Sequence, residues 1–248
     1  TAAAPPDPPS RKEAAVHDPA GFLDLPTSLA TAAVAASAVA LSLRGARREL
    51  DDRAAPLAGL VATFVFAAQM INFPVAAGTS GHLIGGALAA VLVGPWTATL
   101  CLTVVLLVQG LLFADGGLSA LGTNITLMGV VGVWTGYAVF RLALAVLPRR
   151  IGSVPLAAGI GGFVSVPMAA LTFAGLFMVG GTAPLDAGSL VAAMASVHTL
   201  IGVGEGVLTA LVVGSVVAVR PDLVHGARRI RAASIQAAAP APSSGHRA

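Results

Sequence analysis

Two histidines lie where they could bind a metal ion. His82 ends a loop rich in proline, glycine and serine, and His17 precedes the first apolar segment. A neutral imidazole is the commonest metal ligand near pH 7. Capping of a helix by His82 and a simply solvated His17 are the alternatives. Taken one at a time, the two residues leave both interpretations open.

His17 offers more ligand atoms if the mature chain begins at Val16. A free amine followed by histidine at position two supplies an amine nitrogen, a deprotonated amide nitrogen and an imidazole nitrogen, which form fused chelate rings in one plane. One further imidazole would complete a set of four nitrogens. Square-planar nitrogen sites favour Ni(II) or Cu(II), and some Co(II) complexes approach that geometry.

Further polar residues lie in apolar surroundings and could support such a site. His198 and Glu205 are seven residues apart on a late apolar segment, so they share one helix face two turns apart. Because carboxylates in membranes usually face the bundle interior, we expect either a polar lock to another helix or a supporting or gating role. Uncharged residues that could link helices or orient the ligand histidines are Gln69, Asn72, Gln109 and Asn124.

The composition requires that these residues be positioned within a membrane. Hydrophobic residues make up 56% of the 248 and charged residues only 10%, against about 25% in soluble domains. Between residues 54 and 140 the only charged residue is Asp115, and between 151 and 219 only Asp186 and Glu205 occur. This excludes a soluble globular enzyme, a disordered protein and a nucleic-acid binder.

Seven apolar segments predict an all-α, polytopic membrane bundle, because the bilayer interior cannot satisfy open backbone groups. We expect about seven transmembrane helices. The third segment has 13 residues and rises only about 20 Å as a helix, so it must be tilted, shielded by protein or joined to a loop that dips into the membrane. The segments are 26–43, 56–73, 82–94, 95–113, 118–147, 151–180 and 188–219.

Lysine and arginine predict the orientation and the domain limits. Seven crossings with the N-terminus outside place the basic loops inside, and the outer loops then contain no lysine or arginine. We therefore expect an N-out, C-in protein. Residues 1–15 are predicted to be a disordered extension, 16–221 the membrane domain and 222–248 a disordered cytoplasmic tail.

The first segment carries a small residue at every fourth position, which lets another helix approach closely. Packing within the chain and docking against a separate membrane protein are both compatible with this pattern. The residues are Ser28, Ala32, Ala36 and Ala40.

Four segments in order resemble the CbiM/NikM family, the substrate-binding membrane subunits of energy-coupling factor (ECF) transporters for cobalt and nickel. They are HDPAGFLD at 17–24, FAAQMINFPVAAGTSGHLIGGALAAVLVGPW at 66–96, QGLLFADGGLSALGTNITLMGVVG at 109–132 and HTLIGVGEGVLTALVV at 198–213. The resemblance covers nearly the whole membrane part. It implies a multi-pass protein of the plasma membrane that is not itself an enzyme and that carries nickel(II) or cobalt(II).

The resemblance also implies ligands and partners. In that family the initiating methionine is followed directly by histidine, so His17 would supply amide and imidazole nitrogens and His82 the fourth nitrogen. Val16 would supply the amine if a GTG codon starts the mature chain there, which we expect. No Gly-x-x-x-x-Gly-Lys-Ser/Thr run occurs. Energy would therefore come from a transmembrane coupling subunit and two cytoplasmic ATPases, with a small accessory membrane protein as a further partner besides membrane lipid.

An enzyme is the alternative function. The run from Gly78 through Ser80 to Gly81 resembles the Gly-x-Ser-Gly motif of rhomboid intramembrane proteases, and His198 could serve as the base for Ser80. This interpretation leaves the other three matched segments unexplained.

Overall fold

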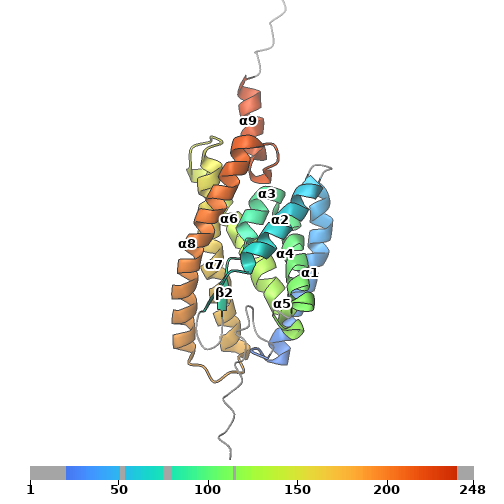
Figure 1. Ribbon diagram of the computed structural model, residues 1–248, viewed down its shortest axis with the longest axis vertical. Helices are drawn as coiled ribbons and strands as arrows, with labels where there is room; N and C mark the ends of the chain where they lie inside the picture. Colours follow the sequence, from blue (N-terminus) through green and yellow to red (C-terminus); the bar gives the residue numbers. More distant parts are fainter. Residues whose placement is uncertain (1–20, 51–53, 75–79, 114–115, 239–248) are drawn as a thin grey trace, which may run out of the picture.

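The computed structural model describes residues 21–50, 54–74, 80–113 and 116–238. These residues form an elongated helical bundle with one two-stranded hairpin (Figure 1), so the predicted all-α class is confirmed. The elements are α1 (Leu25–Gly45), η1 (Ala46–Arg48), α2 (Ala54–Gln69), β1 (Asn72–Pro74), β2 (Ser80–His82), α3 (Gly86–Val93), α4 (Pro95–Leu112), η2 (Leu118–Ala120), α5 (Leu121–Asn124), the π-helical η3 (Ile125–Gly132), α6 (Val133–Val146), α7 (Ser153–Gly180), α8 (Ala187–Val219), η4 (His225–Ala227) and α9 (Arg228–Ala238).

Five helical stretches among the described residues are long and apolar enough to cross a membrane. The helix α2 has 16 residues and α3 has eight, which rise about 24 and 12 Å. The prediction of seven full crossings is therefore not confirmed, although each predicted segment contains helix. The five stretches are Leu25–Arg48, Pro95–Leu112, Leu118–Val146, Ser153–Gly180 and Ala187–Val219.

The short helix α3 lies inside the bundle. All eight of its residues are buried, and α2, α4, α6 and α7 pack around it. A helix this short is marginal on its own, and tertiary packing supplies most of its stability. Enclosure by protein is therefore the alternative that the structure selects for the third apolar segment.

The longest helix pair, α7 and α8, is packed closely through small residues. A Cβ atom on Gly159 would lie 2.9 Å from the carbonyl oxygen of Gly206, and one on Gly206 would lie 2.8 Å from that of Gly159. These glycines therefore let the two backbones approach, as is typical of membrane helices. On the outside of the bundle large apolar side chains are exposed, such as Val146 at 89%, which suits a lipid surface.

The described arginines gather at one end of the bundle, where α1, α6 and α8 end and α9 projects (Figure 1). At the other end, Asp24 caps α1 and Asp186 caps α8, accepting hydrogen bonds from the backbone of Thr27 (2.9 Å) and Ser189 (2.7 Å). The positive charges of the described residues are therefore concentrated at one end of the long axis. The arginines are Arg44, Arg47, Arg48, Arg141, Arg149, Arg150, Arg220, Arg228, Arg229 and Arg231.

Part of the predicted disordered tail is helical. Within 222–248, η4 and α9 form a docked unit, because Val224 and Ala227 are fully buried. A Cβ atom on Gly226 would lie 2.6 Å from the ring of Phe140, so glycine lets the segment settle against α6. The arginine-rich composition concealed these apolar anchors.

Candidate metal site

The hairpin of β1 and β2 fixes the position of His82. In the antiparallel register Asn72 pairs with His82 and Pro74 with Ser80. His82 is buried, and its Nδ1 lies 2.7 Å from the carbonyl oxygen of Leu83. Because a carbonyl only accepts, Nδ1 would donate to it, and a neutral ring would then hold its lone pair on Nε2. That is the tautomer needed for metal binding through Nε2.

Glu205 holds the backbone that follows His82. Its carboxylate accepts hydrogen bonds from the backbone N–H of Ile84 (3.0 Å) and of Gly85 (2.7 Å), and the residue is 1% exposed. Gly85 has φ +72°, where a side chain would be strained and would also meet Val65. Glu205 on α8 thus anchors the start of α3.

Two glutamines extend this polar contact across the bundle. Gln69 Nε2 donates to the carbonyl oxygen of Ile84 at 2.8 Å, and Gln109 Nε2 donates to Gln69 Oε1 at 3.0 Å. Both glutamines are fully buried. Gln109 Oε1 has no hydrogen-bond partner among the described residues. The turn after His82 is therefore held from α8, α2 and, through a relay, α4.

His198 does not join this network in the described residues. Its Nδ1 donates to the carbonyl oxygen of Met194, one turn back in α8, at 3.0 Å. Glu205 shares its helix but bonds to the turn before α3. His198 and Glu205, which the seven-residue spacing predicts on one helix face, therefore have different partners.

The chain segment that leads into α1 is fixed at the aspartate end of the bundle. The backbone N–H of Asp24 donates to the carbonyl oxygen of Gly180 at 2.7 Å, and that of Thr182 donates to Phe22 at 3.0 Å. Leu23 is buried in a cluster with aromatic residues of α7. Val16 and His17 lie outside the described residues, as does the loop 75–79.

No pattern in the sequence predicts the π-helical segment η3. Asn124 is buried at its start. Gly132 lies against the turn after His82, because a Cβ atom there would come within 3.1 Å of the Ile84 side chain. The carbonyl oxygen of Gly129 accepts a hydrogen bond from Thr99 Oγ1 on α4 at 2.9 Å. π-helical turns are rare and frequent at functional sites.

The remaining predicted residues are placed as follows. Asn72 and Ser80 lie in the paired strands β1 and β2. On α1, Ser28 is half-buried and Ala32, Ala36 and Ala40 are exposed. Among the described residues no group of three His, Cys, Asp or Glu side chains could hold a metal ion.

Comparison with known proteins identifies the family. Residues 17–223 match the family model CbiM, described as the cobalt uptake substrate-specific transmembrane region. A cobalt transport protein CbiM of Sorangium cellulosum is 38% identical over 79% of this chain and 88% of the relative. A fused nickel transport protein NikMN of Rhodobacter capsulatus is 36% identical over 84% of this chain, which spans 64% of that protein. The crystal structure of a truncated transition metal transporter superposes with a TM-score of 0.75 and 31% identity, covering 82% of this chain and 99% of the other.

These relatives are named as transport proteins, and they give no support to the alternative of a rhomboid-like protease with Ser80 and His198. The apolar helices of the described residues agree with a protein embedded in a membrane. The family match covers most of the chain, including the hairpin with His82 and the Glu205 contact. The chain belongs to the CbiM family of substrate-specific transmembrane components for cobalt uptake.

Proposed function

We propose that this chain is the substrate-specific membrane component of an ATP-driven ECF-type importer of divalent cobalt or nickel ions in the plasma membrane. The family match over residues 17–223 is the observation that carries this proposal. The relatives are named for cobalt and for nickel, and both ions accept nitrogen ligands. The chain itself supplies the binding site and hydrolyses no nucleotide.

The proposed ligands are the amide and imidazole nitrogens of His17 and the imidazole of His82. Val16 contributes a terminal amine if the mature chain begins there. The tautomer of His82, with Nδ1 donating to Leu83, supports ligation through Nε2. The attachment of residues 22–24 to the start of the α7–α8 loop supports entry of the N-terminal segment from the aspartate end.

Supporting roles follow from the contacts around the turn after His82. Glu205 and Gln109 hold this turn, directly and through Gln69, so they position His82 rather than bind the ion. Asn124 begins the π-helical segment beside the same turn. Asn72 pairs with His82 in the hairpin, and Ser80 lies two residues before it. Any gating by His198 would act through α8.

Transport requires partners. The ion exchanges water for nitrogen ligands at the outer end, and loss of the amide proton makes binding tighter as pH rises. A transmembrane coupling subunit and two cytoplasmic ATPases then reshape or tilt the carrier, with a small accessory membrane protein as a further candidate. One relative is named as a fused nickel transport protein, which supports the proposal that this chain works together with further transport domains. The exposed small residues Ala32, Ala36 and Ala40 of α1 are the proposed docking face.

A nickel and cobalt titration of the purified full chain tests the site. His17→Ala and His82→Ala should each weaken binding by more than the roughly 10–100-fold typical of residues that only support a ligand. His198→Ala is the matched control, because the Nδ1 of its imidazole also contacts the carbonyl oxygen of a residue nearby in the chain. Unchanged affinity in His17→Ala would contradict the proposed ligand set. The mass of the native chain shows separately whether it starts at Val16.

A further inference from the structure

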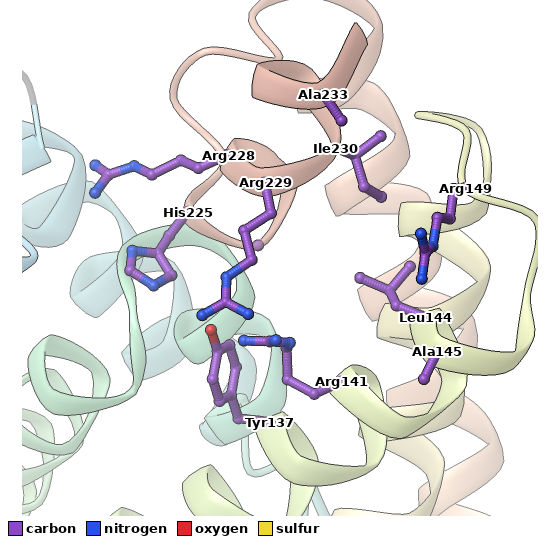
Figure 2. A pocket seen from close by; sticks show the side chains of 11 residues that line it. Tyr137, Arg141, Leu144, Ala145, Arg149, His225, Arg228, Arg229, Ile230 and Ala233 are labelled. Carbon is purple, nitrogen blue, oxygen red and sulfur yellow. The ribbon is translucent and has the colours of Figure 1, made fainter. Parts of the chain in front are cut away.

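A basic cavity lies at the arginine-rich end, away from the metal site. It has a volume of about 780 Å³, is partly open, and is bordered by α6, the loop after it, η4 and α9. Figure 2 shows Arg229 reaching from α9 toward Tyr137 and Arg141, with Arg149 on the opposite side. The size is typical of a small-molecule site. The cavity is lined by Tyr137, Arg141, Leu144, Ala145, Arg149, His225, Gly226, Arg228, Arg229, Ile230 and Ala233.

The charge in this cavity is of one sign. Its described lining holds four arginines and one histidine and neither aspartate nor glutamate. Arg228 also donates to the carbonyl oxygen of Glu49 at 3.5 Å, so one of the four is already engaged. At this end the ion pair that the structure shows joins Arg220 to Asp222 at 2.8 Å, outside the cavity lining. Positive charges gathered on a concave surface attract an anion.

A buried polar atom points to the same conclusion. Nδ1 of His225 is buried without a hydrogen-bond partner among the described residues. Buried polar groups in folded proteins are nearly always hydrogen-bonded, so an exception calls for an absent partner. The ring of Tyr137 lies 6.2 Å from that of His225, centroid to centroid. One lining residue of the cavity thus carries a buried ring nitrogen without a partner among the described residues.

The cavity is a fixed part of the fold. Val224 and Ala227, on either side of His225 and Gly226, are fully buried. Gly226 lies against Phe140 and also against Val91 of α3. The wall that carries Arg228 and Arg229 is therefore anchored on the hydrophobic core.

The position of the cavity selects the kind of anion. Arg141 and Arg149 bracket the end of α6, where the apolar stretch Leu118–Val146 ends, so the cavity lies at the depth of lipid headgroups. Next to it, Leu142 and Val146 are 67% and 89% exposed on the outside of the bundle. Leu144 and Ile230 give the cavity an apolar wall. Arginine pairs well with phosphate oxygens, and basic pockets between membrane helices bind anionic headgroups.

We propose that this cavity is a binding site for the phosphate ester of an anionic phospholipid, held by Arg141, Arg149 and Arg229 with acyl chains along the outside of α6. A bound lipid would tie α9 to the bundle, because arginines from α6, the following loop and α9 would share one phosphate. This proposal does not depend on the identity of the transported ion.

The test uses the full chain in detergent and native mass spectrometry with two lipids, dioleoylphosphatidylglycerol and dioleoylphosphatidylcholine. Wild type should retain the anionic lipid in preference to the zwitterionic one. The pair Arg141→Gln with Arg229→Gln should reduce this preference roughly 30-fold, from the usual contribution of two basic residues near anionic lipid. Arg150→Gln is the matched control, because Arg150 lies at the same end but outside the lining, and it should keep the preference.

Further arms separate folding and other ligands from the proposed lipid. The pair Arg141→Lys with Arg229→Lys keeps both charges and should keep most of the preference, and melting without lipid reports whether each variant is folded. Equal retention of the two lipids by wild type, or an equal loss in Arg150→Gln, would overturn the proposal. So would displacement of phosphatidylglycerol by millimolar inorganic phosphate or by an acidic peptide, since the site would then belong to a soluble anion or to a protein partner.

Discussion

At the scale of residues, two buried glutamates hold the two ends of α3. Glu205 accepts from the backbone at Gly85, before α3, and Glu49 accepts from the backbone of Thr97 at 2.7 Å, just after it. Both turns contain a glycine at positive φ, Gly85 at +72° and Gly94 at +99°. Each carboxylate comes from a distant part of the chain. Sequence spacing marked Glu205 as notable but could not predict its partners, which lie 120 residues away.

The substitution Glu205→Gln should weaken metal binding while the protein still folds. The amide keeps the size of the side chain but offers one oxygen acceptor to two backbone donors, so one N–H loses its partner. We expect a loss of roughly 10–100-fold in nickel affinity, as for other residues that orient a ligand. Glu49→Gln removes the corresponding carboxylate at the other end of α3. It should lower the melting temperature and leave the nickel affinity unchanged. Equal affinities for the two variants would show that Glu205 does not position His82.

His225 should make the attachment of α9 sensitive to pH. Burial, followed by the charges of Arg228 and Arg141, lowers the pKa of His225 from 6.5 to about 4. The neutral ring is therefore favoured in the folded state, so its contribution to stability is complete above pH 6.5 and declines as pH falls from 6.5 toward 4. In lipid-free protein, the protection of α9 against hydrogen exchange, relative to the intrinsic amide exchange rate at each pH, should be lower at pH 5 than at pH 7.

The control for this effect is His225→Asn, which cannot titrate and should show a smaller change between the two pH values. Adding phosphatidylglycerol should reverse part of the effect, because an anion beside His225 favours its protonated form. If the protection of α9 relative to the intrinsic exchange rate is equal at both pH values in the wild type, His225 does not control the docking.

At the scale of elements, apolar periodicity predicted where the helices lie but not how they differ. The segment 118–147 was predicted as one element and matches Leu118–Val146, yet η3 inside it is π-helical. That difference depends on packing, since Thr99 of α4 bonds to the Gly129 carbonyl. Similarly, the composition of α9 suggested disorder, whereas two small apolar residues before it, Val224 and Ala227, dock it. Local sequence does not encode contacts of this range.

The close contact of α7 with α8 should be sensitive to a single methyl group. Gly206→Ala would place a Cβ atom 2.8 Å from the carbonyl oxygen of Gly159, so the helices must separate, at a cost of about 1–3 kcal/mol. Gly204→Ala is the control in the same helix, because nothing lies within 4 Å of its Cβ position. It should be neutral or stabilising by about 0.5–1 kcal/mol. Thermal unfolding of both variants in detergent measures the difference, and similar midpoints would argue against tight packing at Gly206.

At the scale of the whole molecule, the short helices α2 and α3 do not change the end of the bundle at which α1 begins or the end at which α8 stops. The helix α2 begins and α3 ends toward the arginine-rich end, and the strands β1 and β2 come between them in the chain (Figure 1). This unit returns to the side from which it started, whether or not it reaches the opposite surface. The start of α1 and the end of α8 therefore lie at opposite ends with five full crossings as with seven. The distribution of lysine and arginine therefore predicts the same orientation for five long helices as for seven.

Cysteine labelling tests that orientation. The proposed N-out, C-in arrangement places the arginine-rich end inside, as basic residues favour. Ala187→Cys lies at the aspartate end and Arg150→Cys at the arginine-rich end, and both positions are exposed. A membrane-impermeant maleimide added to intact cells should label the first variant and reach the second only after permeabilisation. The native Cys101 is buried and should give little background. Labelling of Arg150→Cys but not Ala187→Cys in intact cells would reverse the orientation and would place the proposed metal entry on the wrong side for an importer.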